Sequence, residues 1–369
     1  MNKFRIPEGS RDLIPIDCKK KRKIEKQIED TFISWGYEEV STPSLEYYSC
    51  LLLNIDDKKS FKLIEEDSNV LALRSDMTVP IGRVVCTKLK NRSYPLRLRY
   101  KANVFSRREK YDGKPIEWTD CGAELIGIGG IKADVEILLL ALETMDFSTP
   151  LEYIMEIGDI RFFDYAVENE KFSKKDLDKL KKLISEKSVP DLKIFLENLD
   201  INEELKYFLL KLPKLWGDKK ILDVAKNLCM NEKMEEVVSY LSEIFEILEE
   251  LGYGDKIFID FSKLNKKSYY TGIIFEVFVK GVGSGVISGG RYDKLLETFG
   301  KGHKAGGFSV KTDLLIDVFQ EEDILTDEFV LKYPENQLVN AFKTAKKLRD
   351  SGKIVVMEKS DIEEISWGV

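Results

Sequence analysis

The side chains that most often carry out chemistry in proteins are scarce in this sequence. Its one histidine is His303, in the glycine-rich segment GKGHKAGGF. A single histidine cannot form a multi-histidine metal site, and any serine–histidine–aspartate arrangement would depend on it alone. Because such a glycine-rich segment is typical of a surface turn, we expect His303 to be an exposed loop residue without a catalytic role.

The cysteines and glycines do not indicate a metal or cofactor site either. No C-x-x-C pair occurs, so the sequence predicts neither a zinc ribbon nor a redox dithiol. The glycines of GVGSGVISGGRYD fit a dinucleotide-binding loop poorly, because no long β-α-β unit with a downstream acidic residue surrounds them. We expect no cofactor, no metal and free thiols, as in a cytoplasmic protein. The five cysteines are Cys18, Cys50, Cys86, Cys121 and Cys229.

Composition indicates a globular protein, and it disfavours both a nucleic-acid-binding protein and a membrane protein. The chain has 369 residues, 43% of them hydrophobic and 33% charged, and its net charge is −7. A broad tRNA-binding face is usually basic, because phosphate neutralisation drives that binding, so tRNA is an unfavoured partner. The N-terminus MNKFRIPEGSRDLIP has no apolar run, and no segment approaches the roughly 18 apolar residues of a membrane span. We therefore expect neither a signal peptide nor a membrane anchor.

Hydrophobic periodicity predicts an α+β fold with an antiparallel sheet and packed helices. Helical spacing begins with Ile24, Ile28 and Phe32, and strands predominate in two blocks that a helical segment separates. We predict a core over residues 1–319, with a helical insertion at about 160–254. A short β-α-β-like element follows at 325–369 and is too small for an ordinary independent domain. The strands are expected near 37–43, 61–73, 95–105, 116–127, 151–157, 257–261, 273–279 and 286–288.

Seven segments, in order, resemble the motifs of class II aminoacyl-tRNA synthetases of the histidyl type. The resemblance covers residues 7 to about 319, and its strength lies in the register of all seven together. It implies a six-stranded antiparallel sheet flanked by helices, and a homodimer with Pro43 at the interface. The segments are PEGSRDLIP (7–15), YEEVSTPSLE (37–46), RSDMT (74–78), the motif 2-like stretch 96–127, SYYTGIIFEVF (268–278), GGRYDKLL (289–296) and GGFSVKTDLLI (306–316).

The same resemblance implies an amino-acid pocket suited to histidine. Asp76, Thr78 and Asp120 fall where the family holds the α-amino group, although the synthetases usually have glutamine at the position of Asp120. Glu124 and Tyr270, beside Tyr269, fall where the imidazole is recognised. These residue types suit that ligand, since an ammonium favours carboxylates and an imidazole N–H needs an acceptor.

Three positions depart from the family at places where the synthetases carry arginine. They hold Ser106 in the motif 2-like stretch, Asn265 before the tyrosine pair, and Leu314 in the motif 3-like segment. Adenylate formation develops negative charge on phosphate, and each preorganised donor lost there typically costs about 10²–10³ in rate. A one-residue slip that brings Arg107 or Arg108 into place would compensate in part. We therefore predict a pseudoenzyme that has lost synthetase activity.

These features are most similar to the regulatory subunits of short-form ATP phosphoribosyltransferase, a family related to the histidyl enzymes. Histidyl-tRNA synthetases carry a full C-terminal anticodon-binding domain, whereas only about 45 residues, of net negative charge, follow the core here. The resemblance implies a non-catalytic homodimer in histidine biosynthesis. It would activate a short catalytic subunit within a hetero-oligomer and transmit allosteric feedback inhibition by L-histidine. The alternative is a divergent histidyl-tRNA synthetase or another free-standing synthetase paralogue, which histidine-dependent ATP–pyrophosphate exchange would support.

Overall fold

A computed structural model describes residues 4–51, 59–107, 115–146, 151–264, 269–319 and 328–368. The chain divides into two compact units, residues 1–318 and 319–369.

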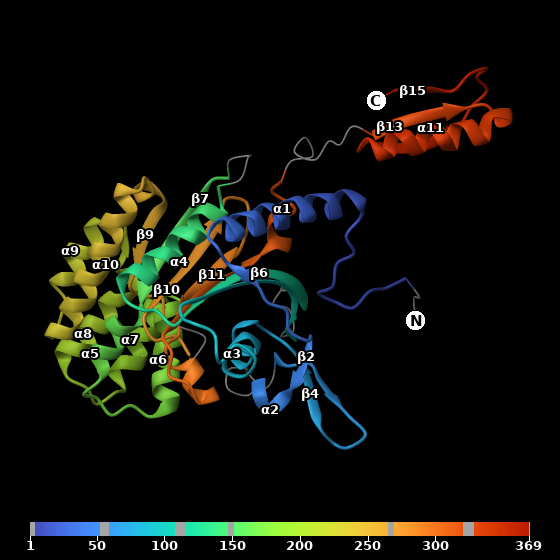
Figure 1. The fold of residues 1–369 in the computed structure, drawn as a ribbon. Coiled ribbons are helices and arrows are strands. Elements are labelled where there is room, and N and C mark those ends of the chain that lie inside the picture. Colours follow the sequence, from blue (N-terminus) through green and yellow to red (C-terminus); the bar gives the residue numbers. More distant parts are fainter. Residues whose placement is uncertain are drawn as a thin grey trace. The chain divides into compact units, whose positions relative to one another are not determined.

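A large sheet forms the centre of the first unit (Figure 1). Six neighbouring strands in its middle, in the spatial order β5, β6, β12, β11, β10 and β7, pair antiparallel throughout. This agrees with the expected six-stranded antiparallel sheet. The described strands extend this sheet to nine and make it mixed, because β1 and β9 pair parallel to their neighbours. In spatial order they are β1 (Glu38–Glu39), β5 (Leu96–Phe105), β6 (Glu117–Ile126), β12 (Ala305–Lys311), β11 (Ile287–Arg291), β10 (Ile273–Val279), β7 (Tyr153–Asp159), β9 (Ile257–Asp260) and β8 (Trp216–Gly217).

Alternation along β5 gives the sheet two different faces. Leu96, Leu98 and Tyr100 point into an apolar core, and this core includes residues of helix α3 (Thr78–Thr87). The intervening Arg97 and Arg99 point to the other face, where helices α1 (Pro15–Ser34) and α4 (Ile131–Thr144) pack. There they form ion pairs with glutamates of α4 and α1 respectively. One face of the sheet is therefore apolar and supports the site described below.

Helix α1 forms where the sequence predicts it. Ile24, Ile28 and Phe32 are fully buried, as their helical spacing indicates, and the helix ends just before Gly36. Phe32 packs edge-on against Phe308 of β12, with 5.7 Å between the ring centroids. The contact fixes the helix on the sheet.

A second, three-stranded sheet lies beside α3. It has the order β2 (Leu45–Tyr47), β4 (Val70–Leu73) and β3 (Lys62–Ile64), and short helix α2 (Tyr48–Leu51) follows β2. The buried guanidinium of Arg74 joins it to the large sheet by donating to the carbonyl oxygens of Thr42, at 2.6 Å, and Asn103, at 2.9 Å. Burial lowers the pKa of this guanidinium.

The helical insertion gathers beyond β9 at one end of the large sheet (Figure 1). Four of its helices begin at side-chain caps, with Asp159, Ser173, Asn202 and Asn231 each accepting a backbone N–H. Its helices are α5 (Ile160–Val167), α6 (Lys174–Ser185), α7 (Val189–Glu197), α8 (Glu203–Lys211), α9 (Lys220–Lys226) and α10 (Glu232–Glu250).

The second unit contains the expected β-α-β arrangement and one strand more. Strands β13 (Glu328–Tyr333) and β14 (Ile354–Lys359) pair parallel on either side of helix α11 (Leu338–Asp350) in sequence. The strand that sequence reasoning missed is β15 (Ser366–Gly368), which pairs antiparallel with β13. Its three residues are too few for a periodic signal.

The expectation of an exposed His303 is wrong. The side chain is half-buried, and its ring lies 4.1 Å from that of Tyr94, tilted by 31°. Packing against an aromatic ring explains its position without any chemistry.

Candidate functional site

A cavity opens on the apolar face of the large sheet, where α3 begins. Its enclosed space is about 10 Å³, and it measures about 290 Å³ only when the solvent at its mouth is counted. Strands β6, β11 and β12 supply one side, and the segment just before β10 supplies another. The described residues that line it are Asp76, Thr78, Tyr100, Asp120, Tyr269, Tyr270, Ser288, Tyr292, Gly307, Phe308 and Ser309.

Two of these residues stand at the start of α3. The carboxylate of Asp76 accepts a long hydrogen bond from the backbone N–H of Val79, at 3.4 Å. Thr78 Oγ1 donates to Glu124 Oε1 at 3.0 Å. The first turn of α3 therefore aligns both residues, and Thr78 connects the helix to the sheet.

Glu124 lies directly beneath the cavity and is 1% exposed. Its Oε1 accepts from Thr78, and its Oε2 accepts from the hydroxyl of Tyr292. Gly307 is its direct partner across β6 and β12, and a Cβ there would overlap Oε2. Burial, together with the adjacent Glu124 carboxylate, raises the pKa of Tyr292 well above its ordinary value. The buried carboxylate is thus held as an acceptor in one fixed position.

Asp120 lies four residues before Glu124 on β6, and because side chains alternate along a strand it points to the same face. The side chain is buried and accepts from the indole N–H of Trp118 at 2.8 Å. Tyr100 of β5 lies close by and is buried, which raises its pKa far above the usual value. This part of the cavity therefore presents a carboxylate among aromatic rings.

The structure brings together all six residues that the sequence associates with histidine. Asp76, Thr78, Asp120, Tyr269 and Tyr270 line one cavity, and Glu124 contacts two lining residues from beneath. Sequence reasoning missed Tyr100 and Tyr292 as members of this site. Tyr292 belongs to the quoted GGRYDKLL segment, so its motif was visible although its role was not.

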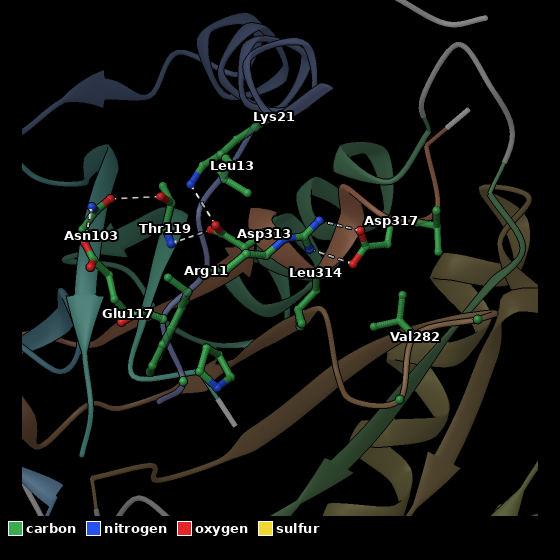
Figure 2. A pocket seen from close by; sticks show the side chains of 17 residues that line it. Arg11, Leu13, Lys21, Asn103, Glu117, Thr119, Val282, Asp313, Leu314 and Asp317 are labelled. Carbon is green, nitrogen blue, oxygen red and sulfur yellow. Dashed lines mark hydrogen bonds and ion pairs between the residues drawn. The ribbon is translucent and has the colours of Figure 1, made fainter. Parts of the chain in front are cut away.

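The positions that lack arginine lie elsewhere or outside the described residues. Asn265 falls in a segment that the structure does not describe. Ser106 is half-buried, and its backbone N–H donates to the carbonyl of Ile116 at 2.9 Å. Leu314 does not line the first cavity and contributes to a second, larger cleft (Figure 2).

The second cleft has charged walls, and among its described lining residues the two basic side chains are both paired. It occupies about 1420 Å³ with the solvent at its mouth. Arg11 donates to both carboxylate oxygens of Asp317 at 2.9 Å, beside Leu314 (Figure 2). Lys21 donates to Asp313 at 2.9 Å, and Asp313 also accepts from the backbone N–H of Thr119. The hydrogen bond from Arg11 lowers the pKa of Asp317.

The described residues contain no group of three or more His, Cys, Asp or Glu side chains placed to hold a metal ion. None of their helices has both the length and the apolar character that a bilayer crossing requires.

Known proteins match this architecture over most of the chain. The family model described as histidyl-tRNA synthetase matches residues 9–315. An ATP phosphoribosyltransferase regulatory subunit of Thermoanaerobacter pseudethanolicus is 36% identical, covering 95% of this chain and 93% of the relative. That of Clostridium acetobutylicum is 34% identical, covering 94% and 88%. A crystal structure of an ATP phosphoribosyltransferase regulatory subunit/histidyl-tRNA synthetase from Bacillus halodurans has a TM-score of 0.87 at 31% identity, covering 98% and 94%.

The sheet, the motif order and the family model together define a class II aminoacyl-tRNA synthetase-like protein of the histidyl type. Within that class, the two sequence relatives described above carry the same name, ATP phosphoribosyltransferase regulatory subunit. The chain belongs to the family of ATP phosphoribosyltransferase regulatory subunits.

Proposed function

We propose that this chain acts without chemistry of its own, as the regulatory subunit of ATP phosphoribosyltransferase in histidine biosynthesis. It assembles with a separate short catalytic subunit, activates it and transmits feedback inhibition by histidine. The names of the relatives support the partner. The observation that supports histidine as the effector is that the six residues expected to bind it gather around one cavity.

The cavity offers the groups that L-histidine needs. Asp76 and Asp120 are suited to the α-ammonium, with the Thr78 hydroxyl beside them. Glu124, fixed by two hydroxyl donors, and Tyr270 are suited to the imidazole. A charge-assisted hydrogen bond to a buried carboxylate is about twice as strong as a neutral one, so this arrangement favours a cationic or N–H-bearing ligand.

The second cleft supports the loss of synthetase activity. Stabilising a triphosphate requires guanidinium or ammonium groups that aim at the phosphates. Arg11 and Lys21 are the basic residues that line this cleft in the described part of the chain, and both are engaged by aspartates. Leu314 can supply neither charge nor hydrogen bond. We therefore propose that ATP does not bind productively, and the net charge of −7 makes tRNA an equally unfavoured partner.

Feedback would operate by population shift. Histidine can inhibit only if it binds one state of the assembled enzyme more tightly than another. The coupling is reciprocal, so the catalytic subunit must in turn alter the histidine affinity of this chain. We also propose a cytoplasmic location, which the five free cysteines support.

We assign the homodimer contact to the open face of the three-stranded sheet. Strand register places Leu45 and Leu73 on this face in one row, and Tyr47, Leu71 and Leu63 in the next. Three of them, at 41% (Leu45), 54% (Tyr47) and 46% (Leu63), are well exposed although all five are apolar. An exposed apolar face of this kind is usually covered by a binding partner. A second copy suits it because the face follows directly after Pro43, where the resemblance expects the dimer interface.

Titration calorimetry with L-histidine and, separately, with ATP tests the proposal. We expect saturable histidine binding and no ATP binding at millimolar concentration. Glu124→Gln, which keeps the shape of the side chain and removes the charge, should weaken histidine binding by about tenfold or more. Tight ATP binding that histidine enhances would contradict the proposal and favour a working synthetase.

A further inference from the structure

Residues 270–271 and 290–292 form one wall of the cavity proposed to bind histidine, and they pack tightly against each other. Gly290 lies under Tyr270, and a Cβ at 290 would stand 2.8 Å from its ring. The backbone N–H of Thr271 donates to the carbonyl of Arg291 at 2.7 Å. The next residue, Tyr292, bonds Glu124. A ligand that moves Tyr270 or Tyr292 therefore moves the backbone of Arg291, because close-packed neighbours cannot shift independently.

The side chain of Arg291 extends from this wall into the protein and meets a buried carboxylate. It donates to Asp134 of α4, and both side chains are nearly inaccessible to solvent. Asp293 adds a second contact to the guanidinium at 3.1 Å. A buried ion pair of this kind tolerates little displacement, since separating its members leaves two uncompensated charges.

The other oxygen of Asp134 reaches the helical insertion. It accepts from the hydroxyl of Tyr240, on α10, at 2.6 Å. The ring of Tyr240 also faces the guanidinium of Arg161 at 5.0 Å, near the start of α5. Asp134 is thus the shared acceptor of two groups, one from the cavity wall and one from the insertion.

We infer that Asp134 and Tyr240 are positioning residues that couple occupancy of the amino-acid cavity to the helical insertion. The inference rests on the proposed histidine binding. When a ligand immobilises the cavity wall, Arg291 holds the carboxylate of Asp134 in one position. That carboxylate in turn holds the hydroxyl of Tyr240, and with it helix α10. Such a shared acceptor transmits a change between sites without any contact between the ligand and the insertion.

Hydrogen–deuterium exchange of the full-length chain, with and without saturating L-histidine, tests this coupling. In the wild type, histidine should slow exchange in residues 232–250 by about tenfold, the effect expected of one strengthened hydrogen bond to a charged group. Tyr240→Phe removes only the hydroxyl. It should lower the histidine affinity by no more than about tenfold, the size of the coupling itself, while the protection of 232–250 disappears. Tyr207→Phe, at an exposed tyrosine of α8, is the matched control and should behave as the wild type.

The outcomes separate the two proposals. Equal protection of 232–250 in Tyr240→Phe and the wild type, or binding without protection in the wild type, overturns the coupling and leaves histidine sensing in place. Absence of histidine binding, both alone and in the presence of the catalytic subunit, overturns the proposed function and the coupling with it. A loss of protection shared by Tyr207→Phe would show a general effect of removing a hydroxyl and would also overturn the assignment.

Discussion

Gly307 and Glu124 lie directly opposite each other in the β6–β12 pair, and the carboxylate of Glu124 occupies the space that a side chain at 307 would need. The acceptor beneath the cavity therefore depends on the absence of a Cβ in the neighbouring strand. The two residues come from segments about 180 positions apart, and only the strand register brings them together.

The first prediction concerns this contact. Gly307→Ala should displace the Glu124 carboxylate from Thr78 and Tyr292, and should weaken histidine binding by about 100-fold or more, because a buried acceptor would lose its geometry. Calorimetry measures the affinity and circular dichroism checks the fold. Gly302→Ala is the control, since a Cβ there meets only ordinary contacts. Unchanged affinity in a folded Gly307→Ala protein would contradict the role of Glu124.

A second prediction isolates one donor to the same carboxylate. Thr78→Val keeps the shape of the side chain but leaves Glu124 Oε1 without its hydroxyl partner. We expect a histidine affinity lower by about five- to 100-fold, which corresponds to about 1–3 kcal/mol. Thr87→Val is the matched control, because the hydroxyl of Thr87 bonds only carbonyl groups of its own helix. Equal effects of both substitutions would indicate that α3, rather than the acceptor, is what matters.

The third prediction concerns stability. Arg74 donates to the carbonyl oxygens of Thr42, Pro43 and Asn103, and so joins the two sheets. Arg74→Met fills the volume but leaves buried carbonyl groups unsatisfied, which should lower the free energy of unfolding by about 2–5 kcal/mol. Urea unfolding measures it. Arg22→Met, at a position outside this junction, serves as the comparison and should change stability by less than about 0.5 kcal/mol.

The fourth prediction tests the homodimer face. Leu63→Asp places a charge on the open surface of β3, away from the buried side of its sheet. Desolvating an unpaired carboxylate at an interface is costly, so the variant should sediment as a monomer where the wild type sediments as a dimer. Ile194→Asp, at an exposed apolar residue of α7, should leave the dimer intact. A dimeric Leu63→Asp protein would place the contact elsewhere.

The sequence is sufficient for the architecture and for part of the site. Ile24, Ile28 and Phe32 mark α1 through their spacing, and the motif order implies the six antiparallel strands that β5 to β7 form. Asp76, Asp120 and Glu124 are identifiable because each stands in a recognisable segment. Local sequence patterns are thus enough to predict an individual helix or strand, and to find a site residue that stands within a motif.

Other features depend on contacts between distant segments and could not be predicted. Tyr100 looks like an ordinary core residue of β5 until the sheet places it beside Asp120. The pairing of Arg11 with Asp317 joins residues 306 positions apart, and it engages one of the basic side chains that line the second cleft. Edge strands β1 and β8 have two residues each, which gives no usable period.

The most direct test of the central claim is reconstitution with a short catalytic subunit of ATP phosphoribosyltransferase. Activity is measured with the catalytic subunit alone, after addition of this chain, and after further addition of L-histidine. We predict that this chain raises the activity and that histidine reverses the increase, with the reversal lost in Glu124→Gln but retained in the exposed-site control Glu186→Gln. An activity that this chain leaves unchanged, together with histidine-dependent ATP–pyrophosphate exchange by the chain alone, would contradict the account.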